Sequence, residues 1–148
     1  MYLEVAKVKV KKNEVSEVLV VKLEKGEDLL EALSSIVKKE NIKAGFFTGI
    51  GALNKVKMGI FVEGKYKEIN VEGELEIVSL LGNVSLKEGK PFVHAHIIVS
   101  RRDGAAFGGH LLPGSIISVT CEIFLVKLKE PLERRFDEKL KLYLLNLD

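Results

Sequence analysis

The 148-residue sequence predicts an α+β domain: a mostly antiparallel β-sheet with one main α-helix at about residues 27–40. Most segments are rich in β-branched residues or alternate apolar with polar residues, which is typical of strands. One segment instead has the period of a helix, and two dipeptides, Glu63-Gly64 and Asp103-Gly104, are typical of tight turns. Since no repeat, low-complexity segment or linker divides the sequence, we expect residues 1–148 to form a single domain.

The first strand and the helix follow each other closely. "VSEVLVVKLE" at 15–24 predicts a strand, and the helix follows in "KGEDLLEALSSIVKKENIKAG". Its apolar residues have the spacing of a helix that buries one face: Leu29, Leu30, Leu33, Ile36 and Val37. Acidic residues near its start (Glu27, Asp28 and Glu31) and Lys38-Lys39 near its end suit the helix dipole.

The remaining elements are predicted to be strands. Residues 43–53 form a buried strand that runs into a glycine-marked turn in "TGIGAL", and the next segment forms a hairpin around Glu63-Gly64. Further strands are expected at 74–81, 83–86, 115–128 and in the opening segment at 1–12. The segment 139–147 is expected to return to the sheet, with a short helix as the alternative.

Composition excludes several classes of protein. With 47% hydrophobic and 30% charged residues the chain is not disordered, and a net charge of +2 excludes the strong positive field of a DNA-coating protein. A single cysteine, no signal-peptide pattern and no apolar run that could span a bilayer predict a cytoplasmic protein without a membrane partner. Abundant Lys and Glu with no Gln or Trp resemble the composition of proteins from hot environments.

All three histidines lie in "FVHAHIIVSRRDGAAFGGHLLPG" at 92–114. His94 and His96 project from the same face of a strand, about 6.6 Å apart along it. A turn at Asp103-Gly104 would bring His110 back beside them, and Gly108-Gly109 would permit a close backbone approach or a positive φ. The spacing therefore predicts that the three imidazoles meet.

Three neutral imidazoles match a tetrahedral zinc site whose fourth position is open to water. Zinc is the expected divalent ion, although nickel, copper or iron would accept the same ligands, and a hydrogen-bonded cluster without metal is the structural alternative. Three strand carboxylates, Glu74, Glu76 and Glu122, are candidates for a fourth ligand or a general base; isolated strand glutamates usually face solvent.

Other candidate residues have simpler explanations. Cys121 in "SVTCEIFLV" is expected to be an inert core or interface residue, and Ser100 and Ser115 lack a nucleophile elbow. "TGIGAL" lacks the third glycine of a dinucleotide site. Three basic groups, Lys7–Lys12, Arg101-Arg102 and Arg134-Arg135, are expected to be solvated edge residues, which would bind nucleic acid only by converging across subunits.

The run "HAHIIVSRRDGAAFGGHLLPGSIISVTCEIFL" resembles the signature of the plants-and-prokaryotes conserved (PPC) domain. The resemblance extends over about residues 15–130 through "ELEIVSLLGNVSL", "FFTGIGALNKVKMGIF" and the helix. It implies an α+β domain that assembles as a homotrimer, with His94, His96 and His110 as metal ligands. Supporting positions of the motif are Asp103, Gly104, Gly108, Gly109, Leu111 and Gly114. The R-G-R-P core of the AT-hook found in plant members does not occur in these 148 residues, as in stand-alone prokaryotic members.

These observations lead to one principal hypothesis and two others. The principal hypothesis is a trimeric regulatory or assembly module with a three-histidine metal site and a DNA-related role. The alternative is a metal-dependent enzyme of the hydrolase or lyase type, whose catalytic residues the sequence does not identify. A carboxylate in the pocket would favour the enzyme, whereas a closed, dry site would favour a structural role. Direct nucleic-acid binding through a composite basic face would weaken steeply with salt.

Overall fold

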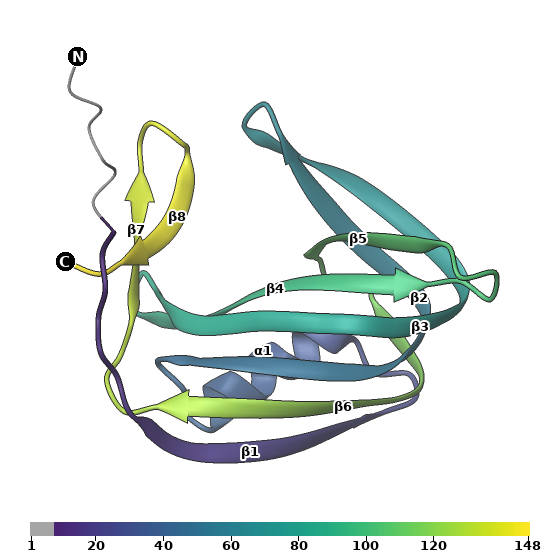
Figure 1. The fold of residues 1–148 in the computed structure, drawn as a ribbon, viewed down its shortest axis with the longest axis horizontal. Helices are drawn as coiled ribbons and strands as arrows, with labels where there is room; N and C mark the ends of the chain where they lie inside the picture. Colours follow the sequence, from purple (N-terminus) through teal and green to yellow (C-terminus); the bar gives the residue numbers. More distant parts are fainter. Residues whose placement is uncertain (1–7) are drawn as a thin grey trace.

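The computed structural model describes residues 8–148 as a strongly curved, eight-stranded sheet with one helix (Figure 1). The elements are β1 (Val15–Glu24), α1 (Leu29–Lys39), β2 (Gly45–Val62), β3 (Lys65–Lys87), β4 (Lys90–Ser100), β5 (Ala106–Leu111), β6 (Ile116–Leu128), β7 (Glu133–Asp137) and β8 (Leu142–Asn146). The strand order is β1-β6-β2-β5-β4-β3-β7-β8, and β2 also pairs with β3. Pairing is antiparallel except between β3 and β7, so the predicted α+β class is confirmed.

Helix α1 begins at Leu29 because Asp28 caps it. One carboxylate oxygen of Asp28 accepts hydrogen bonds from the backbone N–H groups of Leu30 and Glu31, both at 3.1 Å. The other oxygen accepts from the backbone N–H of Gly114 at 2.5 Å, which ties the helix start to the loop after β5. Of the apolar residues whose spacing predicted a buried face, Leu29, Leu33 and Val37 are buried, and Leu30 and Ile36 are partly buried.

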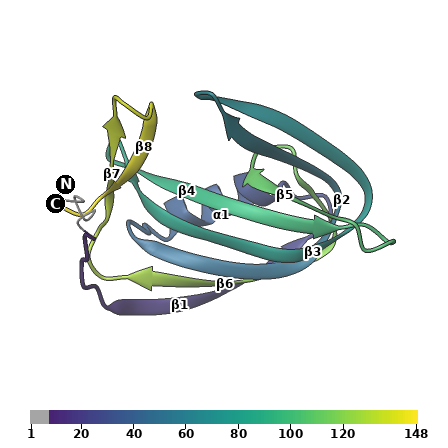
Figure 2. The same ribbon diagram turned by 45° about the horizontal axis from the view of Figure 1, so that its top comes forward.

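The two faces of the sheet differ in what covers them. Helix α1 lies against one face of the sheet (Figure 2). The core side chains on this face include Phe47, Leu80 and Ile123. On the opposite face, directly paired residues form a row across five strands: Val20, Phe124, Thr48, Leu81 and His96. Directly opposite residues of antiparallel strands share a face, so this row places an imidazole beside an apolar surface.

Strands β2 and β3 form one long hairpin. Its turn is at Glu63 and Gly64, with φ values of 50° and 80°, which confirms the hairpin predicted there. The predicted turn in "TGIGAL" is wrong, because β2 continues through it with register shifts between Gly49 and Gly51. A Cβ atom on Gly51 would lie 2.2 Å from the Thr120 carbonyl oxygen, so close strand packing explains this glycine. Similarly, the two strands expected at 74–81 and 83–86 are parts of one strand.

The ends of the chain differ most from the prediction. Of the strand expected at 1–12, residues 1–7 lie outside the described residues and residues 8–12 are not in a strand. Strand β8 confirms that 139–147 returns to the sheet, but the sequence did not predict its partner β7. The β7–β8 hairpin and the end of the β2–β3 hairpin rise on the same side of the molecule, with β4 and β5 between them (Figures 1 and 2). Within residues 8–148, no helix has the length and apolar character needed to cross a membrane.

Candidate metal centre

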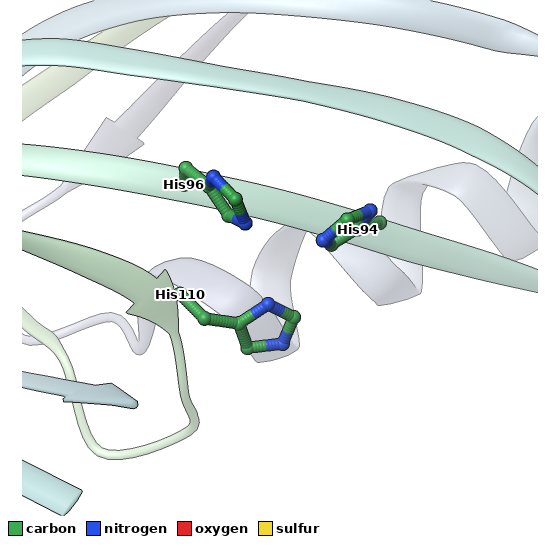
Figure 3. A group of neighbouring side chains, drawn as sticks. All are labelled: His94, His96 and His110. Atoms are coloured by element: carbon green, nitrogen blue, oxygen red, sulfur yellow. The ribbon is translucent and has the colours of Figure 1, made fainter. Parts of the chain in front are cut away.

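The three histidines come together between these two hairpins. His94 and His96 lie on β4 and His110 on β5, where His96 and His110 form a direct cross-strand pair. The ring centroids are 5.0 Å apart for His94 and His96, 5.0 Å for His94 and His110, and 5.6 Å for His96 and His110. Each ring directs a nitrogen toward the space between them (Figure 3). The convergence expected from the spacing is therefore present.

The turn at Asp103-Gly104 produces this alignment. Gly104 has a φ of 82°, its N–H donates to the Arg101 carbonyl oxygen at 2.9 Å, and the Asp103 carboxylate accepts from the Ala105 N–H at 3.0 Å. The chain reverses here and returns as β5, antiparallel to β4. Asp103 and Gly104 therefore set the register that places His110 opposite His96.

Glycines then allow β5 to lie close to its neighbours. A Cβ atom on Gly109 would lie 3.0 Å from the Gly59 carbonyl oxygen, and one on Gly108 would lie 3.1 Å from Ile98 Cγ1. Neither glycine is among those with positive φ, so of the two explanations offered above only close approach applies. Beyond them, Leu111 is buried and Gly114, with a φ of 100°, donates to Asp28. These contacts anchor the end of β5 to the helix.

The residues fit a divalent metal ion in donor type and in polarity. One nitrogen from each ring lies within 4.8 Å of the other two, whereas the ligand nitrogens of a tetrahedral zinc ion are about 3.4 Å apart, so modest ring rotations would complete the geometry. The Nδ1 atom of His110 is buried and has no hydrogen-bond partner within the described part of the chain. A buried polar atom without a partner is costly, and a metal ion would relieve that cost.

The electrostatic surroundings keep two of the imidazoles neutral. Burial, together with smaller contributions from the positive charge of Arg134 and from the other two histidines, lowers the pKa of His94 to about 4. Burial also lowers the pKa of His110, with His96 and Arg134 contributing. Neutral imidazole is the form that binds metal, so both side chains are in the competent form at neutral pH.

Arg134 is a site residue that the sequence did not reveal. Its guanidinium donates to Ser85 Oγ at 2.9 Å, the Asn83 side-chain oxygen at 2.7 Å and the Tyr143 carbonyl oxygen at 3.1 Å. Its Nη2 also lies 3.4 Å from His94 Nδ1. The prediction that Arg134 is a solvated edge residue is therefore wrong. Strand β7 pairs in parallel with β3 and carries Arg134 opposite Lys87, a pairing that no local pattern indicates.

The other basic residues are placed more nearly as expected. Arg135 and Arg102 are exposed, and Arg102 forms a 2.8 Å ion pair with Glu74. Arg101 stacks over the Phe107 ring at 4.7 Å. In the amino-terminal group, Lys9 pairs with Asp148, while Lys7 lies outside the described residues.

None of the three candidate carboxylates reaches the histidines. Glu74 and Glu76 line a hollow of about 480 Å³ with Arg101 and Arg102, near the end of β4 remote from His94. Glu122 lies on β6, where it pairs with Lys22 of β1 and with Ile50 of β2. Neither they nor any other carboxylate of residues 8–148 lines the cavities at the histidines. All three are exposed, as expected for isolated strand glutamates, and none takes the alternative role of fourth ligand or general base within this chain.

Two cavities open at the histidine cluster. One of about 370 Å³ lies toward the β2–β3 hairpin, where the Tyr66 ring stacks on His110 with centroids 4.8 Å apart. The other, of about 380 Å³, lies toward the β7–β8 hairpin and is lined by His94, His110 and Arg134 among others. Since His96 is itself exposed, the space between the three rings is accessible from solvent.

The remaining nucleophiles have structural roles. Cys121 is completely buried in the core, and burial raises its pKa to about 12, which makes its thiol inert. Ser115 is buried, and its hydroxyl oxygen accepts from the Lys57 N–H at 3.0 Å. Ser100 ends β4 opposite Ala106.

Comparison with known proteins agrees with this fold and motif. The family model of the Plants and Prokaryotes Conserved (PCC) domain matches residues 10–129. The chain belongs to this family. The PCC match includes α1 and all three histidines, and it ends before β7 and β8.

Solved structures match nearly the whole chain. A plant- and prokaryote-conserved (PPC) protein of Pyrococcus horikoshii is 39% identical with a TM-score of 0.85, over 94% of this chain and 97% of that one. A metal-containing protein of Archaeoglobus fulgidus is 35% identical with a TM-score of 0.84, over 93% and 98%. A candidate DNA-binding protein of Bacteroides thetaiotaomicron is 25% identical with a TM-score of 0.84, over 91% and 97%.

The curated relatives are much longer proteins. A bifunctional protein GlmU of Synechococcus is 30% identical over 115 residues, which cover 77% of this chain and 17% of that protein. The match therefore covers about a sixth of that relative's length.

Proposed function

We propose that this PCC-domain chain is a cytoplasmic, metal-dependent binding module in which His94, His96 and His110 hold one divalent ion, with zinc expected. The observation that supports this most directly is that one nitrogen of each imidazole lies within 4.8 Å of the other two. The buried Nδ1 atom of His110, which has no hydrogen-bond partner among the described residues, adds to it. The similarity to the metal-containing protein of Archaeoglobus fulgidus supports it further. A zinc ion held by three imidazoles supplies a Lewis acid with one position open to water or an anion.

The surroundings favour a binding role over a purely structural one. A structural metal site is closed, whereas cavities of about 380 and 370 Å³ border these histidines. General acid–base chemistry needs a positioned proton carrier, and no carboxylate of the described residues lines either cavity. An open site without a carboxylate suits recognition of a ligand, which a regulatory or assembly module requires.

The proposal includes assembly as a homotrimer. Six large apolar side chains are exposed on the sheet face opposite α1: Val18, Val20, Phe46, Ile50, Leu81 and Phe124. Monomeric proteins rarely expose a continuous apolar surface of this kind. Two further copies of this chain are the occupants that the family resemblance implies. Because Leu81 pairs directly with His96, the metal site would lie at the edge of the subunit interface.

Metal content tests the proposal directly. Protein purified without an affinity tag should contain about one divalent ion per chain by mass spectrometry of the elements. His96→Ala and His110→Ala should each lose most of it, because two imidazoles bind a divalent ion far more weakly than three. Ser100→Ala on the same strand is the control and should retain it. Wild-type protein that stays metal-free after incubation with zinc would refute the metal site.

A metal-dependent hydrolase or lyase is the second candidate. The exposed side chain of His96 favours it, because water could reach the open position of the ion. Zinc-loaded protein should then hydrolyse 4-nitrophenyl acetate or hydrate carbon dioxide faster than His96→Ala does. Equal rates for the two proteins would remove this candidate.

A DNA-related role is the third element of the proposal, and the similarity to the Bacteroides thetaiotaomicron protein supports it. Arg101 and Arg102 lie at one end of β4, and Arg134 lies near its other end with its donors engaged by protein groups. A DNA surface would therefore need basic groups from several subunits. Binding to duplex DNA should weaken steeply between 50 and 200 mM salt, and no gel shift at low salt would exclude it.

A further inference from the structure

We propose that the cavity between the histidines and the β7–β8 hairpin binds a small organic anion: a carboxylate or phosphate attached to a flat ring. The cavity has a volume of about 380 Å³, which suits a ligand of that size. The metal site proposed above forms one wall of this cavity. Arg134 and Lys87 would recognise the negative charge of the ligand. The proposal rests on the proposed function only for the metal ion beside the cavity.

Two cations of the cavity wall lack an acidic partner. Arg134 and Lys87 both line the cavity, and no carboxylate of residues 8–148 forms an ion pair with either. A half-buried guanidinium without a counter-ion is electrostatically unfavourable, because burial opposes its charge. An anionic ligand would supply the missing negative charge, which none of the described side chains that line the cavity carries.

Protein contacts hold Arg134 in place before any ligand arrives. Ser85, Asn83 and the Tyr143 carbonyl group accept three of its N–H groups, and a fourth faces His94. A guanidinium has five N–H groups, so one remains for a ligand. Since the side chain is already ordered, binding costs little conformational entropy. Arg134 therefore acts as a fixed positive charge in the cavity wall.

Aromatic rings form the rest of the wall. The Phe136 and Tyr143 rings lie 5.2 Å apart on the β7–β8 hairpin, and Phe92 and Tyr66 line the cavity from other strands. Lys87 Nζ lies 4.4 Å from the Tyr143 ring centroid and 5.0 Å from that of Phe92. Apolar rings beside cations favour a ligand with a flat apolar body and an anionic end.

The acidic groups near this cavity are engaged with other partners. Glu88 accepts a hydrogen bond from the Tyr143 hydroxyl group, and Glu138 pairs with Lys141 at 2.9 Å. Lys141 is therefore neutralised, although it lines the cavity. Neither glutamate lines it, so the excess of positive charge within the cavity belongs to Arg134 and Lys87.

The test is calorimetric titration of the full chain, with and without zinc, using benzoate, phenyl phosphate and the neutral isostere benzamide. Benzoate and phenyl phosphate should bind, and benzamide should bind at least about tenfold more weakly because it carries no charge. Arg134→Gln should weaken binding of both anions about tenfold or more, whereas Arg135→Gln, its exposed neighbour, should bind as the wild type. Lys87→Gln and its exposed control Lys90→Gln form a second pair.

Equal binding of benzoate and benzamide, or equal affinities of Arg134→Gln and Arg135→Gln, would overturn the proposal. If circular dichroism shows that Arg134→Gln does not fold, the comparison of Lys87→Gln with Lys90→Gln replaces it. Equal anion affinities of these two variants would then overturn the proposal. Zinc content is measured on the same samples. Protein that contains zinc but binds neither anion would contradict this proposal and leave the proposed metal site intact. Metal-free protein that binds the anions would support this proposal even if the protein binds no zinc.

Discussion

Arg134 Nη2 lies 3.4 Å from His94 Nδ1, although the two residues are 40 positions apart in the chain. The contact opposes an imidazolium, which would place a second positive charge beside the guanidinium. Arg134 therefore helps burial to keep His94 neutral. This role belongs to a residue that lies outside the matched family region.

Arg134→Gln should raise the pKa of His94 from about 4 toward its ordinary value of 6.5. It should not reach that value, because burial is the larger cause of the shift and remains in the variant. A proton NMR titration of the metal-free imidazoles measures this. Arg135→Gln is the control, and a His94 pKa that is the same in both variants would contradict the role given to Arg134.

The metal-free protein should lose stability as the pH falls from about 7 toward 4. The pKa of His94 is about 4 in the folded chain and near 6.5 when unfolded, so between these values the unfolded chain binds a proton that the folded chain does not. The lowered pKa of His110 acts in the same direction. Urea unfolding at several pH values should show a smaller pH-dependent loss for His94→Asn. Parallel curves for the two proteins would contradict this.

Gly109→Ala should reduce both stability and zinc affinity. The new Cβ would lie 3.0 Å from the Gly59 carbonyl oxygen and 3.2 Å from Met58 Cβ, which pushes β5 and His110 away from β2. We expect a loss of about 1–3 kcal/mol in the free energy of unfolding. Gly49→Ala crowds Ile123 at 2.8 Å on the core side, and it should lower stability without changing zinc affinity. Equal zinc affinities in both variants would show that β5 can shift without moving the site.

Phe124→Asp should convert the proposed trimer into monomers. Phe124 is 54% exposed at the centre of the apolar face, and a charge buried there between subunits would be unpaired. Light scattering at micromolar concentration measures the mass. Leu140→Asp, at a side chain that is 52% exposed in the β7–β8 hairpin, is the control and should stay trimeric. A monomeric wild type would refute the trimer itself.

Asp28→Ala should lower the free energy of unfolding by about 1–3 kcal/mol, because it removes the helix cap and the bond to Gly114 together. Asp28→Asn keeps an acceptor for the helix and should cost less. Chemical denaturation compares the two variants with wild type. The ranking fails if alanine and asparagine at this position are equally destabilising.

The sequence was most informative where the governing physics is local. Apolar spacing predicted α1, and the Glu63-Gly64 and Asp103-Gly104 turns follow from the φ values that their glycines adopt. The histidine cluster was predictable for the same reason, because an i, i+2 pair and one tight turn suffice to align His94, His96 and His110. Each of these features depends on residues within about twenty positions.

The missed features depend on pairing between distant segments. Gly49 and Gly51 resemble turn residues in sequence, and only the packing of β6 against β2 explains them. Arg134 resembles a surface cation until β7 pairs with β3 and brings it to Asn83 and His94. No spacing rule connects such residues, since the register of a remote strand pair is set by the whole sheet.

The two walls of the cavity proposed to bind an anion come largely from different parts of the chain. The imidazoles lie on β4 and β5, while Arg134, Phe136 and Tyr143 lie on the β7–β8 hairpin, after the last residue of the family match. The hairpin therefore supplies one of the two cations proposed to recognise an anion, whereas the other, Lys87, lies on β3 within the family match. Exchanging the final hairpin between members of the family should change the proposed ligand selectivity and, because Arg134 faces His94, the pKa of that imidazole as well.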